Sequence, residues 1–493
     1  MTKEIDVVFV NPGDRQAVYQ ELGNEFSAIE PPSLAATFAE YLRQKKHTVA
    51  IVDAPAHNLS PLNVAQYIEK NYKPTLIVVV VYGFQPSAST QNMPAASETC
   101  THIKSLMPDA KIMMTGTHPA ALPERTLLEE DIDFVCDREG PETIYFTLQA
   151  LKEGKNDFSN THSLWYWDDE TVKHNQPGPL MKDLDNEMPG AAWDLLPMDK
   201  YRAHNWHCFD HIFDREPYAS IHTSLGCPYK CTFCCINAPF GGSSYRTWSP
   251  DTVIKEIDIL VNKYGVKNIK FVDEMFVLKP AHVIGICDKI IERGYDLNIW
   301  VYARVDTVKD EFLVKLKQAG VRWLALGIES ASKHVRDGVE KGRFGSIDII
   351  ATVRKIQAAG INVIGNYIFG LPDDTHESMQ ETLDLALETN CEFANFYCAM
   401  AYPGSKLYDM AIQNQWELPE SWIGYSQHAY ESFPLRTEKL SNIEVLRFRD
   451  EAFMKYFTHP KYLALVNEKF GSHVVEHLQK MTEVKLKRKI LGD

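Results

Sequence analysis

Short apolar runs alternate with helical periodicity through the first third of the chain. The runs lie at 5–10, 47–52, 76–82, 111–115 and 133–136, and the first of them ends at the turn residues Asn11, Pro12 and Gly13. Between the runs, apolar residues recur at helical spacing over 34–42, 62–72, 97–106 and 122–128. Short buried strands that alternate with helices are typical of a parallel, doubly wound sheet. The pattern therefore predicts an α/β domain over residues 1–151.

The second half of the chain alternates strand-like and helical patterns around six strands. The strand-like runs are 218–222, 269–272, 299–303, 323–327, 362–369 and 392–398, and the helical segments are 250–264, 282–293, 311–319, 346–359 and 379–388. Ser249 is a favourable N-cap for the first of these helices. Because crossovers between parallel strands are right-handed, six repeats predict an open, partial (β/α) barrel.

Two segments lack this regular alternation. Residues 152–216 are punctuated by Gly and Pro, with one added strand expected at 163–167, so we interpret them as a linker. Within this linker the stretch 201–211 holds His204, His207, His211 and Cys208. A metal site is the alternative, but the spacing fits no common zinc pattern, and we expect the stretch to pack over the active site or the corrin. Residues 414–493 are rich in aromatic side chains, with helices expected at 443–457 and 462–481, and should cap the barrel. We interpret the basic run 485–489 as a solvated helix end.

Composition narrows the class of protein. A chain of 493 residues is too long for one compact core, so two or three domains are expected. The net charge of −15 argues against a dedicated nucleic-acid groove. The most apolar run is far too short to span a bilayer, and the first residues lack the apolar core of a signal peptide. Ten irregularly spaced cysteines favour a reducing compartment over a disulfide framework. We therefore expect a cytoplasmic protein with no integral membrane segment.

A cysteine triplet follows the first strand of the predicted barrel. Cys227, Cys231 and Cys234 have the spacing C-x3-C-x2-C. Three thiolates so close together suit three corners of a four-iron four-sulfur cluster, because soft sulfur ligands select iron–sulfur chemistry. The fourth iron would then be open to a small molecule. A structural zinc site and ordinary buried cysteines are the alternatives, but zinc needs a fourth ligand and the adjacent Cys235 offers poor geometry.

The triplet resembles the cluster motif of the radical S-adenosylmethionine (radical SAM) enzymes. In that family SAM chelates the open iron, and residues at the barrel strand ends hold the rest of SAM. The resemblance implies that Asp273 and Glu274 hold the ammonium group and that Arg304 pairs with the carboxylate. It also implies close backbone approach at Gly327 and ribose contacts from Glu329 and Ser330. Helix-capping acids and structural ion pairs are the alternative interpretations of these residues.

An α/β domain placed before such a triplet resembles the cobalamin-dependent class of radical SAM enzymes. The resemblance implies four parts, namely a Rossmann-like cobalamin-binding domain over 1–151, a linker over 152–216, a radical SAM partial barrel over 217–413 and a helical C-terminal extension over 414–493. Ligands of doubly wound sheets bind at the carboxyl ends of the strands. The candidate cobalamin contacts are therefore Asn11, Gly83, Gln85, Ser87, Gly116, Thr117, His118, Gly140 and Glu142.

The cobalt ligand is not specified by this resemblance. The chain lacks the D-x-H-x-x-G signature by which some cobalamin proteins bind cobalt, so the lower axial position has no assigned residue. We expect His118 to lie near the corrin rather than on the metal. The alternative for the whole domain is a Rossmann-like scaffold that holds no cofactor.

The implied chemistry is radical chemistry on a small-molecule or lipid-linked substrate. The family's cluster receives an electron from an external donor such as flavodoxin or ferredoxin and cleaves SAM to a 5′-deoxyadenosyl radical. With cobalamin, the implied reaction is C-methylation of an unactivated carbon. The alternative is a cobalamin-binding cyclase, ring-contraction or rearrangement enzyme without methyl transfer. A methylthiotransferase is disfavoured, because Cys100, Cys136 and Cys208 do not have the spacing of a second cluster. A non-catalytic electron carrier would not need the strand-end residues.

Overall fold

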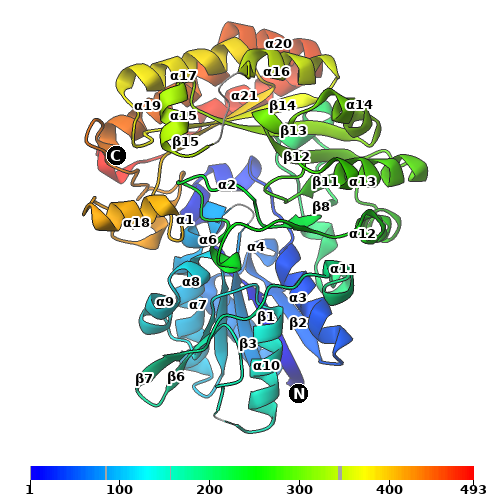
Figure 1. The fold of residues 1–493 in the computed structure, drawn as a ribbon, viewed down its shortest axis with the longest axis vertical. Coiled ribbons are helices and arrows are strands. Elements are labelled where there is room, and N and C mark those ends of the chain that lie inside the picture. Colours follow the sequence, from blue (N-terminus) through cyan, green and yellow to red (C-terminus); the bar gives the residue numbers. More distant parts are fainter. Residues whose placement is uncertain (1, 84–85, 156, 342–346) are drawn as a thin grey trace.

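The N-terminal region of the protein is a doubly wound sheet. The computed structural model describes residues 2–83, 86–155, 157–341 and 347–493. The strands of the first sheet are β1 (Lys3–Asn11), β2 (Val49–Asp53), β3 (Tyr72–Val81), β4 (Ile112–Gly116), β5 (Phe134–Cys136), β6 (Leu164–Asp168) and β7 (Thr171–His174). They lie in the order β2-β1-β3-β4-β5-β6-β7, and the first five are parallel. This sheet forms the lower half of the molecule in Figure 1 and confirms the predicted α/β fold.

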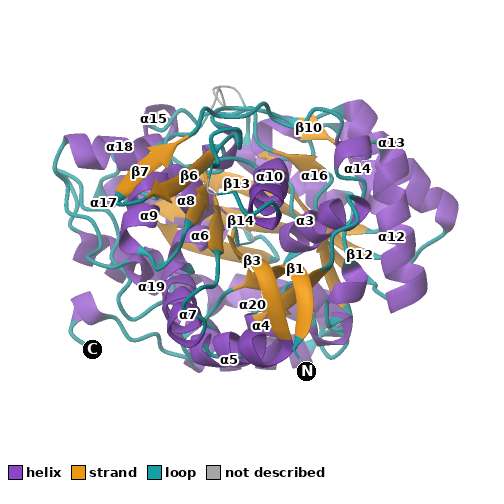
Figure 2. Cartoon of the chain, turned by 90° about the horizontal axis from the view of Figure 1, so that it is seen from below, coloured by secondary structure: helices purple, strands orange, loops and turns teal. Residues whose placement is uncertain are grey.

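Alternate residues of the central strands face two separate cores. On β3, Leu76 and Val78 pack toward α3 (Ser33–Gln44) and α10 (Pro141–Lys152), whereas Ile77 and Val79 belong to the core beneath α5 (Pro61–Asn71) and α7 (Met93–Leu106). Figure 2 shows these two helix pairs on opposite sides of β1 and β3. A strand covered on both faces must be apolar at every position, which is why β3 has no alternation of apolar and polar residues.

Short helices follow the carboxyl ends of the strands, and a helix was predicted at only one of these places. They are α1 (Arg15–Tyr19), α2 (Leu22–Glu25), α4 (Ala54–His57), α6 (Pro86–Gln91), α8 (Thr117–Ala121) and α9 (Pro123–Glu129). Most are too short to show a helical repeat of apolar residues, so the sequence pattern indicated only the last of them. In Figure 1, α1, α2, α4 and α6 lie between the two halves of the molecule.

The segment that follows α10 adds a hairpin to the first sheet. β6 pairs antiparallel with β5, and β7 pairs antiparallel with β6. One strand was predicted here, and β7 was missed because its four residues are mostly exposed and polar. Beyond the hairpin the chain forms α11 (Leu184–Glu187) and short 3₁₀ turns that lead to the second sheet.

The second sheet is the predicted partial barrel. Its strands are β8 (Tyr218–Ile221), β11 (Asn268–Phe271), β12 (Asn298–Arg304), β13 (Val321–Glu329), β14 (Asn362–Phe369) and β15 (Phe393–Cys398), in the order β15-β14-β13-β12-β11-β8. All the neighbouring pairs are parallel. The connecting helices are α12 (Pro250–Tyr264), α13 (Pro280–Arg293), α14 (Asp310–Gln318), α15 (Lys333–Gly338), α16 (Ile349–Ala358) and α17 (His376–Thr389).

A 3₁₀ segment, Trp206–His211, fills the amino-terminal end of the barrel. The Trp206 ring lies 5.1 Å from that of Trp300 and 5.6 Å from those of Trp323 and Phe393. His207 hydrogen-bonds the backbone carbonyl of Asn298, the first residue of β12. Most of this segment therefore packs at the barrel floor, away from the strand ends that carry the cysteines. The placement of residues 207–211 differs from the expected cover over the active site or the corrin, whereas His204 and Trp206 line a cavity between the two sheets.

The C-terminal extension packs against both halves. The extension begins after α18 (Lys406–Gln413), and its helices are α19 (Asn442–Phe457), α20 (Pro460–Phe470) and α21 (Ser472–Glu483). The single helix expected at 462–481 is therefore two helices divided at Gly471. The basic run is solvated only in part, because Lys485, Lys487 and Lys489 are exposed whereas Arg488 is not. Arg488 is only 1% exposed, and its guanidinium pairs with Asp450 of α19 at 3.0 Å. Across the described ranges, no helix combines the length and apolarity needed to cross a bilayer.

A buried ion pair joins the two halves. The Lys270 ammonium on β11 donates to both oxygens of Glu30, each at 3.2 Å, and it lies 4.7 Å from the centre of the Trp300 ring. Glu30 comes from the segment that follows α2, and His204 of the linker approaches the same carboxylate at 3.7 Å. Both charged side chains are about 95% buried or more. Three distant parts of the chain thus meet at one carboxylate inside the barrel.

Removal of one partner of this pair should destabilise the whole molecule. Lys270→Met leaves the Glu30 carboxylate buried without its cation, which costs about 3–5 kcal/mol. Urea denaturation should show this loss, whereas the double variant with Glu30→Gln should recover a large part of it. The exposed pair Lys73–Glu4 supplies the control, and Lys73→Met should cost less than about 1 kcal/mol. Equal costs for the two lysines would contradict the assignment.

Candidate active site at the domain interface

Three adjacent cavities lie between the two sheets. The barrel-mouth cavity, about 260 Å³, opens at the carboxyl ends of the barrel strands. The interdomain cavity, also about 260 Å³, extends from β1 and β3 of the first sheet into the barrel, and the small bridging cavity lies beside both. They share walls. Tyr302 and Tyr397 line the two large cavities, Gly83 lines the interdomain and bridging cavities, and Glu274 lines the bridging and barrel-mouth cavities.

The cysteine loop is fixed at its base by Asp273. This fully buried carboxylate accepts hydrogen bonds from the backbone N–H of Thr223 at 2.6 Å and from the hydroxyl groups of Thr223 and Ser224. Ser224 begins β9 (Ser224–Leu225), which pairs with β10 (Arg246–Thr247) and closes the loop that carries the triplet. Asp273 lines none of the three cavities. Its role in the structure is thus to hold the loop, whereas the sequence suggested a direct ligand contact.

The three thiols of the triplet influence one another. Burial raises the pKa of Cys227 to about 11, with smaller contributions from the charges of Glu274 and Cys231. Burial also raises the pKa of Cys234, and the charges of Cys235, Cys231 and Cys227 raise it further. Thiols that repel one another as thiolates lie close together and would gain from a shared positive centre, which fits an iron–sulfur cluster. Among the described residues, no three His, Cys, Asp or Glu side chains gather as ligands for a single metal ion.

Two of the strand-end residues face the barrel mouth beside the triplet. The Arg304 guanidinium donates to Cys231 Sγ at 3.8 Å, lies 3.8 Å from the centre of the Tyr229 ring and pairs with both oxygens of Asp306 at 2.9 and 3.0 Å. Glu274 lines the same cavity, and burial, together with the charge of Asp273, raises its pKa to about 8. A cation bound beside this carboxyl group would favour its ionised form and lower its pKa again.

The end of β13 contributes an ion pair that the sequence did not indicate. The Glu329 carboxylate pairs with the ammonium group of Lys341, and both side chains are more than nine-tenths buried. A Cβ at Gly327 would lie 2.7 Å from the charged atoms of both, so glycine leaves them room in the cavity wall. The hydroxyl of Ser330 lies 3.2 Å from the hydroxyl of Thr382. Ser330 lines none of the three cavities. Lys341 was missed because it follows α15 and not a strand.

The candidate cobalamin residues divide among different cavities. Asn11 and Gly83 line the interdomain cavity, and Thr117 joins Gly83 in the bridging cavity. Gly140 and Glu142 line a separate small cavity. A Cβ at Gly116 would lie 2.0 Å from the Val81 carbonyl oxygen, so this glycine permits the close approach of β4 to β3. The remaining candidates are Gln85, which lies outside the described residues, and Ser87, whose side chain is likewise not described.

His118 is packed inside the N-terminal domain. Its Nδ1 lies 3.2 Å from the Thr90 hydroxyl, and its ring meets the Trp422 ring edge-on at 4.4 Å. Burial, with a smaller contribution from Arg125, lowers the pKa of His118 to about 3. The side chain lines none of the three cavities. The imidazole of His118 is thus held by the Thr90 hydroxyl and by Trp422 of the C-terminal extension.

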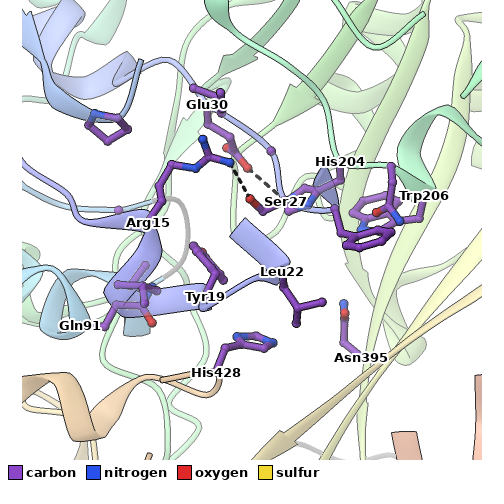
Figure 3. Close-up of a pocket in the computed structure, with 18 of the residues that line it drawn as sticks. Arg15, Tyr19, Leu22, Ser27, Glu30, Gln91, His204, Trp206, Asn395 and His428 are labelled. Atoms are coloured by element: carbon purple, nitrogen blue, oxygen red, sulfur yellow. Dashed lines mark hydrogen bonds and ion pairs between the residues drawn. The ribbon is translucent and has the colours of Figure 1, made fainter. Parts of the chain in front are cut away.

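The interdomain cavity has walls from every part of the chain. Figure 3 shows Arg15, Tyr19 and Gln91 on one side, with His204, Trp206 and Asn395 opposite. His428 and Arg449 come from the C-terminal extension. Arg15 donates to the Ser27 hydroxyl at 3.1 Å and forms no ion pair among the described residues. Of these residues only His204 was singled out from the sequence. Arg15, Tyr19 and Gln91 were missed because they lie on short helices, and His428 and Arg449 because the C-terminal extension has no motif.

Two known protein families match this chain, one in each of the two halves that enclose the cavities. Residues 22–145 match the B12 binding domain, and residues 221–386 match the Radical SAM superfamily. The chain belongs to the radical SAM enzymes that carry a B12-binding domain. The B12-binding match covers β2 to β5 with their helices, and the radical SAM match runs from the end of β8 into α17. The cysteine triplet lies near the start of the radical SAM domain.

Relatives of this radical SAM enzyme include methyltransferases and a cyclase. An uncharacterized methyltransferase of Pyrococcus horikoshii is 29% identical over 474 residues, which is 96% of each chain. The anaerobic magnesium-protoporphyrin IX monomethyl ester cyclase of Rubrivivax gelatinosus is 27% identical over 82% of this chain and 69% of its own. The structure of the radical SAM methyltransferase TsrM of Kitasatospora setae superposes with a TM-score of 0.65 at 19% identity, covering 84% of this chain and 75% of that one. That superposition shows a shared fold.

The raised pKa of Glu274 predicts how stability depends on pH. Folded wild-type protein keeps this proton up to a pKa of about 8, whereas the unfolded chain releases it near 4.5. The free energy of unfolding of the wild type should therefore fall, relative to Glu274→Gln, as pH rises from 4.5 to 8, by up to about 1.4 kcal/mol per pH unit. Denaturation at several pH values measures the slope. Glu311→Gln, at an exposed site, is the control, and parallel curves for wild type and Glu274→Gln would refute the account.

Proposed function

We propose that this enzyme methylates an unactivated carbon of a small molecule, with a four-iron four-sulfur cluster, SAM and cobalamin as its cofactors. Cys227, Cys231 and Cys234 would hold the cluster, and the barrel-mouth cavity would receive SAM. The interdomain and bridging cavities would receive the corrin. An external one-electron donor such as flavodoxin or ferredoxin would serve the cluster. The matched domains and the methyltransferase relative support this proposal.

One observation carries the proposal. The cavity beside the cysteines and the cavities beside the B12-binding domain share wall residues, so groups bound in them would lie next to one another. Glu274 and Val272 line both the barrel-mouth and the bridging cavities, and Gly83 links the bridging cavity to the interdomain one. Parallel sheets bind ligands at the carboxyl ends of their strands. Two such edges that face one another give a single reaction chamber.

The residues of the chain position the cofactors and exclude water. The cluster and SAM together supply a carbon-centred radical, and cobalamin supplies the methyl group. Glu274 is placed to accept a cation in the barrel mouth, and the neighbouring ion pairs of Arg304 and Lys341 keep fixed charges at the same wall. Tyr302 and Tyr397 form the partition between the two large cavities, where they would shield reactive species from solvent.

The fit of the corrin rests on the edge of the first sheet. Asn11 donates to Asp53 at 2.9 Å, and the Tyr201 hydroxyl donates to the other oxygen of the same carboxylate at 2.7 Å, so the end of β1 is held rigidly. The neighbouring wall at Gly83 has no side chain, which leaves backbone exposed to a bulky planar ligand. Relatives support the assignment, because the structure of TsrM has cobalamin and a 4Fe–4S cluster bound.

The first test of this function concerns the cysteines. Replacement of Cys227, Cys231 or Cys234 with alanine removes one iron ligand, so each variant should lose the cluster while it keeps the fold. Iron and sulfide analysis after anaerobic reconstitution measures the loss, and circular dichroism checks the fold. Cys235→Ala is the matched control and should keep the cluster, because Cys235 is not one of the three proposed ligands. A full cluster in Cys231→Ala would end the proposal.

The second test concerns the reaction. SAM labelled in its methyl group should deliver the label to product, and both S-adenosylhomocysteine and 5′-deoxyadenosine should accumulate. Two SAM molecules are then consumed for each product, one by methyl donation and one by cleavage. Mass spectrometry of anaerobic turnover mixtures, with extracts of the source cells as substrate, measures all three species. Formation of 5′-deoxyadenosine without S-adenosylhomocysteine would contradict methylation.

A second candidate function follows from the cyclase relative. That enzyme is 27% identical over 82% of this chain, so the same two domains could serve an oxidative cyclisation, a ring contraction or a rearrangement. The product would then keep the carbon count of its substrate. The labelling experiment separates the two candidates, because only the methylase transfers label from SAM.

A further inference from the structure

Lys341 is a buried cation beside the cysteine loop. Its side chain is 8% exposed and lines the barrel-mouth cavity together with Cys234 and Cys235. The ammonium group pairs with Glu329, and it lies 5.8 Å from the centre of the Phe233 ring, which immediately precedes Cys234. The backbone N–H of Lys341 donates to the Arg336 carbonyl at 3.1 Å, which fixes the segment where the lysine begins. A solvent-facing role does not explain this placement.

The charge of Lys341 acts on the thiols of the triplet. Burial opposes its charged form, but Glu329 and Cys231 outweigh that cost and raise the pKa of Lys341. Arg304 contributes a second cation, because its Nη1 donates to Cys231 Sγ at 3.8 Å. Two buried cations, Arg304 and Lys341, therefore line the same barrel-mouth cavity as Cys234 of the triplet.

Cations at this place have a definite electrostatic consequence for a cluster. One-electron reduction adds a negative charge to the cluster without making or breaking a bond. The reduction potential of such a cluster depends on nearby charge, on hydrogen bonds to its sulfur atoms and on exposure to solvent. A buried cation stabilises the added electron more than an exposed one does, because the effective dielectric constant inside the protein is lower.

We propose that Lys341, held in place by Glu329, is a positioning residue that raises the reduction potential of the cluster bound by Cys227, Cys231 and Cys234. The inference rests on the proposed function, because it requires the cluster. The electron comes from the external low-potential one-electron donor, and the oxidised cluster is its acceptor. Because the lysine stabilises the added negative charge, the donor reduces the cluster more readily. Glu329 opposes this effect in part, since it places an anion beside the cation.

The experiment is a spectroelectrochemical titration of the anaerobically reconstituted full chain in the absence of SAM. Without SAM, any contact between Lys341 and SAM is removed from the measurement. Lys341→Met should lower the midpoint potential by about 59 mV, which corresponds to a tenfold change in the reduction equilibrium. Glu329→Gln should shift the potential in the opposite direction, and Lys341→Arg should keep it near the wild-type value. Lys315→Met, which removes an ion-paired lysine from α14, is the control and should leave it unchanged.

The outcomes separate this inference from the proposed function. If wild-type protein assembles no cluster, the proposed function falls and the inference falls with it. If the cluster assembles and Lys341→Met shifts the potential no more than Lys315→Met does, the inference alone is overturned. Weaker SAM binding in Lys341→Met at an unchanged potential would likewise overturn it, since the lysine would then act on SAM alone. Should Lys341→Met fail to hold a cluster, Glu329→Gln decides, and a potential that does not rise refutes the inference.

Discussion

The buried ion pair between Glu30 and Lys270 is the contact on which the arrangement of the active site depends. Glu30 belongs to the chain that leaves the B12-binding sheet, and Lys270 points from β11 into the barrel. A charge pair in an apolar interior is costly unless its geometry is good, so the pair permits little relative movement of the two halves. Trp300 stacks beside the ammonium group and His204 approaches the carboxylate. The pair thereby fixes how the two sets of strand ends face one another.

The chemistry of the site follows from that fixed geometry. Each parallel sheet delivers its loops to one edge, and the two edges enclose cavities that share Glu274, Gly83 and two tyrosines. Buried charges in the barrel mouth come as pairs, with Arg304 against Asp306 and Lys341 against Glu329. Paired charges keep the wall close to neutral while they still present a cation toward the thiols. Such a wall suits a site where an electron and a charged cofactor must meet away from water.

Much of this architecture could be predicted from the sequence because long, buried elements have strong patterns. All six barrel strands and the five parallel strands of the first sheet were found, since each is an apolar run bounded by turn residues. The exposed strand β7 and the short helices α1 and α2 have no such pattern and were missed. Residue types at strand ends located the cavity wall, but they did not distinguish Glu274, which faces the cavity, from Asp273, which braces the loop. That distinction depends on backbone direction after β11, which no spacing rule specifies.

The central claim is that one interdomain site holds a cluster and a corrin together. Metal analysis after anaerobic reconstitution with iron, sulfide and hydroxocobalamin, followed by desalting, tests it most directly. The account predicts about four iron atoms and about one cobalt atom retained per chain, with the absorption bands of both groups in the same sample. Cobalt lost on desalting while iron is retained would contradict the claim, because the B12-binding domain would then be a scaffold without its cofactor.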